Sequence, residues 1–300
     1  MEDKRGSVDR VIALLLLGKV VQIGGMLSSP ISRCLFSFFG KGCCLALAIS
    51  LTSCGQKADP NTPEPLVVGM EMAYPPFEMR GPDNKPDGIS VRMAEDLAKY
   101  IGRPLELRDT EWNGIIPALQ TKKIDLIISS MTKTPERARQ IAFSDGYVTN
   151  GLCMLVRWGS PIKSISDVKP GEHKLAVKVA TTGHQWARKE LPGVELITLD
   201  ESAACVLEVI QGKADAFVYD QISIYQFWKK YENETRPILK PIREETWAIG
   251  LHKDDVELLE QVNQFLIDYR AKGRFDELAE QYMAEQKAAF GKMGVPFIFH

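Results

Sequence analysis

The stretch IDLIISSMTKTPERARQIAFSDGY, residues 124–147, joins an apolar run to a group of hydrogen-bond donors. Residues 124–129 are typical of a strand, and Thr134 before Pro135 predicts the N-cap and first position of a helix. Ligands of open α/β sheets bind where strands end and helices begin. The hydroxyls, the free N–H groups of the helix start and Arg137 would together bind a small anion such as a carboxylate. An ordinary capped helix with a surface arginine is the alternative.

Apolar runs and amphipathic segments alternate on both sides of this stretch. Besides residues 124–129, strands are expected over 66–70, 105–109, 174–179, 194–199 and 215–220. Helices are expected between them over 90–102, 114–123, 182–191 and 201–212. The repeated strand–helix order predicts an α/β protein with two similar lobes, each a mostly parallel sheet covered by helices.

The domain boundaries follow from the same alternation. Residues 66–150 are expected to form lobe 1, and residues 151–247 lobe 2. Two hinge strands should join the lobes, with crossings near 147–152 and 243–248. The last section, 248–300, contains two further expected helices and should return to lobe 1.

The amino terminus, residues 1–53, has the layout of a secretory signal. Its apolar run CCLALAISL (43–51) is too short to span a bilayer and is followed by small residues and Cys54. The motif LTSC resembles the bacterial lipobox, in which the cysteine is acylated, and residues 54–65 read as a flexible tether. An uncleaved apolar anchor is the alternative, and Met26 is a possible true start.

Composition and spacing exclude several classes of function. A net charge of −2, with no basic run interleaved with aromatics, argues against nucleic-acid binding. No Ser-His-Asp order, metal-spaced His and Cys or glycine-rich phosphate loop is visible, so neither a cofactor, a metal nor catalysis is expected. Cys153 and Cys205 fit two buried thiols, or one bridge if the protein is exported.

Four ordered segments, 73–79, 112–147, 176–183 and 213–220, resemble the bacterial extracellular solute-binding proteins that feed polar amino-acid ABC importers, above all the glutamine-binding type. The similarity runs over about residues 66–283. It implies the two-lobed periplasmic-binding-protein type II clamshell, acting as a monomer. Such a protein binds a free amino acid between its lobes and delivers it to the importer's permease subunits. The implied location is periplasmic or at the cell surface, with the protein held to the membrane by a lipid anchor.

The resemblance also implies roles for individual residues. Arg137, Ser130 and Thr132 match the groups that hold the ligand's α-carboxylate in that family. Asp220 matches the acid that accepts the α-ammonium, and Thr182 stands where the second lobe assists the carboxylate. A zwitterion needs a fixed cation and a fixed anion, and here different lobes would supply them.

The remaining candidates concern the ligand's side chain. Tyr74 and Trp112 match the flanking aromatic positions, although core packing is the usual role of such residues. Glu71 and Lys178 would offer an acceptor and a donor to a neutral amide, so glutamine is the first choice and arginine or lysine the second. Alternatively, Glu71 and Lys178 pair with each other at the surface.

Two features depart from the family pattern. Residues 88–93 read GISVRM where the family has acids, and Tyr219 stands where the glutamine-binding type has histidine. The same fold hosts dehydratases, for which Glu71 is the one candidate acid or base, and amino-acid-sensing receptor domains. Receptor domains usually continue into a membrane span and a signalling domain, whereas this sequence stops at His300.

Overall fold

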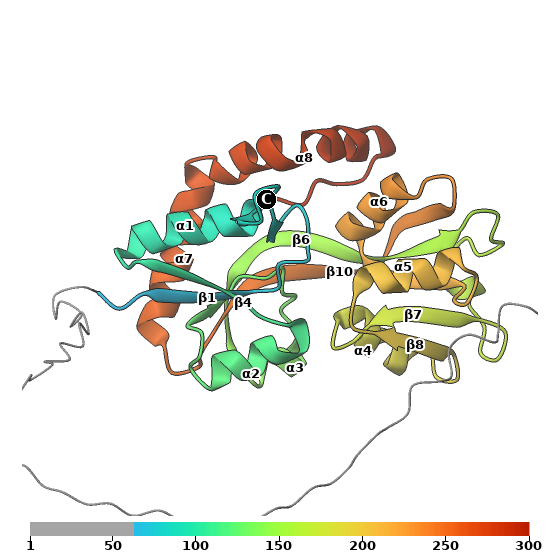
Figure 1. Ribbon diagram of the computed structural model, residues 1–300, viewed down its shortest axis with the longest axis horizontal. Helices are drawn as coiled ribbons and strands as arrows, with labels where there is room; N and C mark the ends of the chain where they lie inside the picture. The colour runs from blue at the N-terminus through green and yellow to red at the C-terminus, as the bar shows by residue number, and fades with distance from the viewer. Residues whose placement is uncertain (1–62, 300) are drawn as a thin grey trace, which may run out of the picture. The chain divides into compact units, whose positions relative to one another are not determined.

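A computed structural model describes residues 63–299 (Figure 1). The predictions for the signal segment 1–53, for Cys54 and for Met26 lie outside the described residues and stay predictions, as does most of the tether 54–65. Among the described helices, none combines the length and the apolar character needed to cross a bilayer.

The strands make one large sheet and a small hairpin. The strands are β1 (Leu66–Met70), β2 (Met79–Arg80), β3 (Pro86–Asp87), β4 (Leu105–Asp109), β5 (Leu126–Ile127), β6 (Ala142–Arg157), β7 (Lys174–Lys178), β8 (Glu195–Leu199), β9 (Ala216–Asp220) and β10 (Thr235–Leu251). The large sheet has the order β4-β1-β5-β10-β6-β9-β7-β8, and β2 pairs with β3.

The helices cover this sheet on both faces. They are α1 (Ile89–Ile101), α2 (Ile115–Gln120), α3 (Pro135–Ala138), α4 (Thr182–Glu190), α5 (Ser202–Ile210), α6 (Gln221–Lys230), α7 (Val256–Ala271) and α8 (Arg274–Met293), with 3-10 turns η1 (Trp112–Gly114) and η2 (Ile165–Asp167). The helix α1 shows why they form, since its apolar residues recur on one buried face and it ends at Gly102, whose φ is 79°.

The pairing pattern confirms a mostly parallel sheet in each half. In lobe 1, β1 lies parallel to β4 and β5, and in lobe 2, β7 lies parallel to β8 and β9. The long strands β6 and β10 are antiparallel to each other and occupy the centre of the sheet, so they connect the lobes (Figure 1). The assignment of exact lobe boundaries and hinge crossings stays a prediction.

Some elements differ from the sequence expectation. The strand expected over 124–129 pairs only at Leu126–Ile127, because the chain then turns through Ser130, whose φ is 49°. The helix α6 was not foreseen, since its buried residues are five consecutive ones, Gln221–Tyr225, and show no helical period. The full lengths of β6 and β10 were also missed.

The apolar core is continuous on one face of the sheet and divided on the other. One cluster combines residues of α1, α7 and α8 with residues of α5 and α6 from the other half. On the opposite face, α2 and α4 each pack on a separate cluster, one in each lobe. The cleft therefore opens on the face where the core is interrupted. Cys153 and Cys205 are both free and buried in the continuous cluster, so they do not form a bridge.

The carboxyl-terminal helix α8 contacts both lobes. It kinks at Met283 and then runs over α6 (Figure 1), where Phe290 meets Tyr225 edge to face at 5.3 Å between ring centroids. Beyond α8, the chain returns to the hinge region, and the Thr149 N–H donates to the Ile298 carbonyl at 2.8 Å. Residues 274–299 therefore link the two lobes on the face opposite the cleft.

Candidate functional site

Polar side chains converge where the parallel strands end. Glu71 directly follows β1, whereas Lys178 and Asp220 are the last residues of β7 and β9. These strand ends, with α3, α4 and η1, surround a small inner cavity. Eight of the nine predicted ligand-binding residues line it: Glu71, Tyr74, Trp112, Ser130, Thr132, Arg137, Thr182 and Asp220. The ninth, Lys178, reaches the site through Glu71.

Arg137 is a buried cation held in place by the short helix α3. The Thr134 hydroxyl caps this helix by accepting from the Arg137 N–H at 3.2 Å, as the sequence predicts. The guanidinium donates to the carbonyls of Thr132 in lobe 1 (2.8 Å) and Ala180 in lobe 2 (3.2 Å). It also lies over the Trp112 ring, 5.2 Å from the centroid.

Arg137 has no acidic partner in contact. Its exposed fraction is 4%, and within residues 63–299 no carboxylate oxygen lies within 4.0 Å of the guanidinium. Burial lowers the pKa of Arg137 to about 10, opposed by the charges of Glu245 and Asp220, so the side chain is cationic at neutral pH. A buried cation bonded to carbonyl oxygens alone is suited to an incoming anion.

Asp220 is the carboxylate of lobe 2 that faces the cavity. Its exposed fraction is 9%, and Asn150 donates to its Oδ1 at 3.1 Å. Burial, and then the charge of Glu245, raise the pKa of Asp220 well above the usual range of a carboxyl group. An ammonium group in the cavity would reverse this shift, because an opposite charge favours the ionised form.

The sequence analysis missed two acids of the site, Glu78 in the inner cavity and Glu245 in a second, outer pocket. Glu78 is fully buried, accepts from the Ser130 hydroxyl at 3.1 Å, and has its pKa raised to about 8 by burial. Glu245, on β10, accepts from the hydroxyls of Thr132 and Thr182. Their local contexts, PPFEM and REETW, contain nothing that separates these acids from surface acids.

Glu71 and Lys178 pair across the cleft. Lys178 Nζ lies 2.5 Å from Glu71 Oε2, with side-chain exposures of 2% and 10%. The prediction of a surface pair is therefore wrong in one respect, because this pair is buried. Burial raises the pKa of Glu71, against the opposing effect of Lys178. Glu111 and Glu201, which are both exposed, have carboxylate oxygens within 4.8 Å of one another and of Glu71.

The two predicted aromatic residues differ in their surroundings. Tyr74 is buried and contacts Trp247 edge to face at 5.6 Å and Tyr219 at 6.1 Å, so it belongs to the core as well as to the cavity wall. Trp112 is half-buried and presents its ring to Arg137. Tyr219, which stands in place of a histidine, also lines the cavity.

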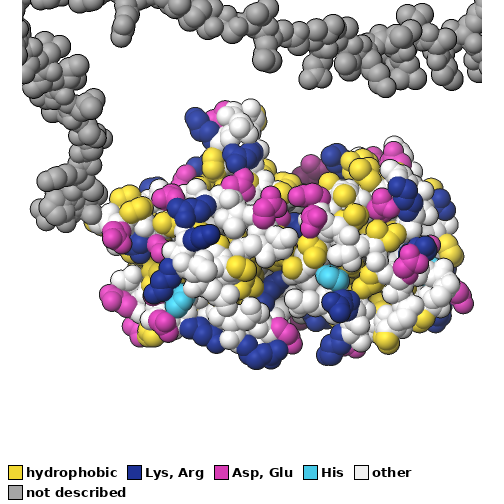
Figure 2. Space-filling model, turned by 60° about the horizontal axis from the view of Figure 1, so that its bottom comes forward, with side chains coloured by type: hydrophobic (Ala, Val, Ile, Leu, Met, Phe, Trp, Pro, Cys, Tyr) yellow, Lys and Arg dark blue, Asp and Glu magenta, His cyan; other side chains and the backbone are white. Residues whose placement is uncertain are grey.

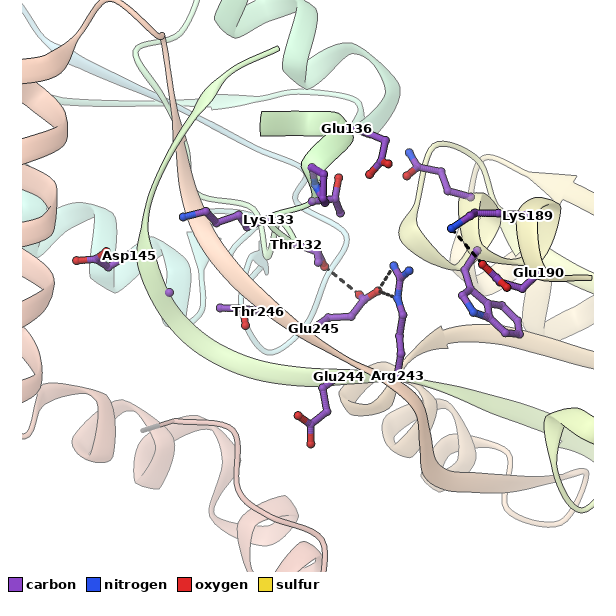
Figure 3. A pocket seen from close by; sticks show the side chains of 15 residues that line it. Thr132, Lys133, Glu136, Asp145, Lys189, Glu190, Arg243, Glu244, Glu245 and Thr246 are labelled. Atoms are coloured by element: carbon purple, nitrogen blue, oxygen red, sulfur yellow. Dashed lines mark hydrogen bonds and ion pairs between the residues drawn. The ribbon is translucent and has the colours of Figure 1, made fainter. Parts of the chain in front are cut away.

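The inner cavity is small beside a second pocket with which it shares Thr132. It measures about 20 Å³, which is room for about one water molecule. A pocket of about 720 Å³ lies on the other side of Thr132 and is lined by residues of both lobes, among them Arg243 and Glu245 (Figure 3). The amino acid predicted by the resemblance would therefore need side chains or lobes to move. Figure 2 shows acidic and basic side chains on both halves of the face that it presents.

Residues 66–285 match the family described as bacterial extracellular solute-binding proteins, family 3. The chain belongs to this family. A relative of this solute-binding protein is the L-cystine-binding protein TcyJ of Escherichia coli strain K12. It is 30% identical over 219 residues, which are 72% of this chain and 82% of TcyJ.

Solved structures agree with the family assignment. The ancestral amino acid-binding protein AncCDT-1, a precursor of cyclohexadienyl dehydratase, superposes on the solute-binding protein with a TM-score of 0.67. It is 35% identical, over 72% of this chain and 94% of its own. An ancestral arginine-binding protein bound to glutamine superposes with a TM-score of 0.68. It is 32% identical, over 73% of this chain and 97% of its own. These likenesses confirm the predicted type II periplasmic-binding-protein fold.

Proposed function

We propose that this protein captures a free polar amino acid outside the cytoplasm and delivers it to the permease subunits of an ABC importer. One observation carries the proposal. Arg137 of lobe 1 and Asp220 of lobe 2 are buried and line the same cavity, and within residues 63–299 neither has an oppositely charged side chain in contact. A guanidinium cation and a carboxyl group that ionises beside an ammonium, supplied by different lobes, match the two ends of a zwitterion.

The hydroxyls of Thr132 and Thr182 extend this arrangement. They point at one common oxygen, Glu245 Oε2, from different lobes. With Arg137, they can hold the α-carboxylate of an amino acid, while Asp220 accepts its α-ammonium. Ser130 donates to Glu78 and would support this group rather than bind directly. Each lobe binds one part of the ligand, so binding favours the closed form.

Glutamine is the first choice for the ligand. The pair of Glu71 and Lys178 has one acceptor and one donor, and an amide inserted between them satisfies both. Lys178 also repels a cationic side chain. The similar ancestral arginine-binding protein was solved with glutamine bound, which supports this choice.

Arginine or lysine is the second choice, and a specific observation favours it. The exposed Glu111 and Glu201 lie beside Glu71, so three carboxylates and one ammonium gather at the rim next to Glu71. The excess negative charge would attract a cationic side chain. Lys178 is the residue that separates the two choices.

The location of the protein is part of the proposal. Export, acylation of Cys54 and attachment to the membrane by lipid chains follow from the sequence motif at residues 51–54. Membership in a family of extracellular proteins supports export. Delivery to permease subunits is inferred from the importer families that such proteins serve.

Thermal unfolding of the full chain with twenty amino acids tests the ligand. The protein is first unfolded and refolded to remove carried-over ligand. A ligand present at 100 times its dissociation constant raises the free energy of unfolding by about 2.7 kcal/mol. Glutamine should raise the unfolding midpoint, and Arg137→Ala and Asp220→Asn should abolish the shift. Arg139→Ala, an exposed arginine two residues away, should leave it intact.

The outcomes separate the alternatives. A shift with arginine or lysine alone would keep the amino-acid site and reject glutamine. If no amino acid shifts the unfolding midpoint, the transport proposal fails. A dehydratase or a receptor domain then becomes the favoured function. Incubation with prephenate-like acids then tests the dehydratase directly, since turnover that Glu71→Gln abolishes would assign an enzyme.

A further inference from the structure

Glu245 is a buried carboxylate that reaches into the site from the connecting strand β10. Its exposed fraction is 4%. Oε2 accepts from Thr132 Oγ1 at 3.0 Å and from Thr182 Oγ1 at 2.8 Å. Oε1 accepts from Arg243, from Nε at 2.9 Å and from Nη2 at 2.6 Å. Figure 3 shows the carboxylate between Thr132 and Arg243.

The two hydroxyls that bind Glu245 are those assigned above to the ligand's α-carboxylate. A hydroxyl has one proton to donate, so Thr132 and Thr182 cannot donate to Glu245 and to a ligand at the same time. Both threonines are buried, which makes the loss of an acceptor costly. Glu245 and a ligand carboxylate therefore exclude each other at these two donors.

The same contact joins the lobes. Thr132 follows β5 in lobe 1, whereas Thr182 begins α4 in lobe 2, and one oxygen atom accepts from both. The charge of Glu245 also acts on Arg137, because it raises the pKa of the guanidinium against the lowering effect of burial. The two hydroxyls assigned to the ligand's carboxylate therefore hold a carboxylate of the protein itself.

The outer pocket offers space for a displaced Glu245. The inner cavity, at about 20 Å³, has no room for the side chain. The outer pocket of about 720 Å³ is lined by Thr132, Arg243 and Glu245 itself. Arg243 is 41% exposed and already holds Oε1, so both side chains can rotate outward together.

We propose that Glu245 is an internal substitute for the ligand's α-carboxylate, which latches the lobes together without ligand and is displaced into the outer pocket by an amino acid. The ligand assignment rests on the proposed function, whereas the latch rests on the contacts of Glu245 alone. In the free protein, the latched form competes with the form that can bind an amino acid. The apparent affinity for the amino acid therefore falls as the fraction of latched molecules rises.

Glu245→Ala tests the proposal, with Glu244→Ala as the matched control. Glu244 precedes Glu245 on β10, is exposed, and points away from Thr132 (Figure 3). Fluorophores attached through non-natural amino acids at the exposed positions Gln120 on α2 and Arg188 on α4 report the distance between the lobes by energy transfer in the full chain.

Two results are expected. Without ligand, the lobes should stand further apart in Glu245→Ala than in the unmodified protein and in Glu244→Ala. Glutamine, measured by calorimetry with arginine as the second probe, should bind Glu245→Ala about tenfold more tightly, because no competitor has to be displaced. Glu245→Gln should also increase the distance between the lobes and the affinity for glutamine, but by less. This variant replaces Glu245→Ala in the test if the alanine variant does not fold.

Other results overturn the proposal. An unchanged distance in ligand-free Glu245→Ala would remove the latch, and weaker binding than in the unmodified protein would make Glu245 a support of the ligand site instead of a competitor. Opening of Glu245→Ala in a protein that binds no amino acid would support the latch and contradict the proposed function.

Discussion

Glu78 shows how one buried side chain can make stability depend on pH. The folded protein raises the pKa of Glu78 to about 8, mainly through burial, above the ordinary value of 4.5. A carboxyl group whose folded pKa is raised contributes stability below its unfolded pKa, and this contribution is lost as the pH rises through the folded pKa. The ligand-free protein should therefore lose stability between about pH 5 and 8.

Glu78→Gln removes this dependence while keeping the shape of the side chain. Between pH 5 and 8.5, the free energy of unfolding of the unmodified protein should fall by roughly 2–4 kcal/mol more than that of the variant. Urea unfolding at several pH values measures the difference. Glu244→Gln, at an exposed position, serves as the control. If the free energy of unfolding varied with pH in the same way in Glu78→Gln and in the unmodified protein, the titration would not belong to Glu78.

Asp220 should couple ligand binding to proton release. Its pKa is raised by burial in the free protein, and a bound α-ammonium would lower it. Glutamine should accordingly bind more tightly as the pH rises from 6 to 8, with release of a proton. Calorimetry in two buffers of different ionisation enthalpy counts that proton, and Asp220→Asn should bind weakly with no proton release. Equal heats in both buffers would reject the coupling.

At the scale of elements, α3 determines the position of Arg137. The Thr134 cap holds the first turn through the Arg137 N–H at 3.2 Å. Thr134→Ala should cost about 1 kcal/mol of stability and weaken glutamine binding several-fold, because the guanidinium loses its fixed orientation. Thr121→Ala, which removes an exposed hydroxyl at the end of α2, should change neither. Denaturant titration and calorimetry measure both effects.

The same element shows what a sequence can predict. Thr134, Pro135 and Arg137 lie within four positions, so the cap and its cation can be recognised from local order. Glu245 could not be recognised, because its partners Thr132 and Thr182 are 113 and 63 residues away. Contacts at such separations depend on tertiary pairing that no local pattern encodes.

Among the strands, too, those with a clear local pattern were predicted and those without one were not. Five of the six expected strands match, namely β1, β4, β7, β8 and β9, which are short and bounded by turns. The hinge strands β6 and β10 were not recognised as single elements, since Gly146, Gly151, Pro237 and Pro241 interrupt their patterns. Their pairing accommodates these residues through register shifts, including one between Ile238 and Arg243.

At the scale of the described molecule, residues 63–299, the two lobes are held together on the side of α8. Phe290 is fully buried and contacts Tyr225 on α6, whereas Phe275 is 4% exposed and packs on Tyr269 within lobe 1. Either Phe→Ala substitution should cost roughly 3–5 kcal/mol of stability. Only Phe290→Ala should also increase the ligand-free distance between the lobes. Equal distances in the two variants would show that α8 does not restrain the lobes.

The contact of α8 with α6 limits the directions in which the lobes can rotate. Two rigid bodies joined by strands could bend, twist or slide, but twisting and sliding would separate Phe290 from Tyr225. Bending about a line near this contact preserves it and widens the opposite side, where among the described residues α2 and α4 pack on separate clusters. The motion should then follow one coordinate, so that a single interlobe distance suffices to describe how far the molecule has opened.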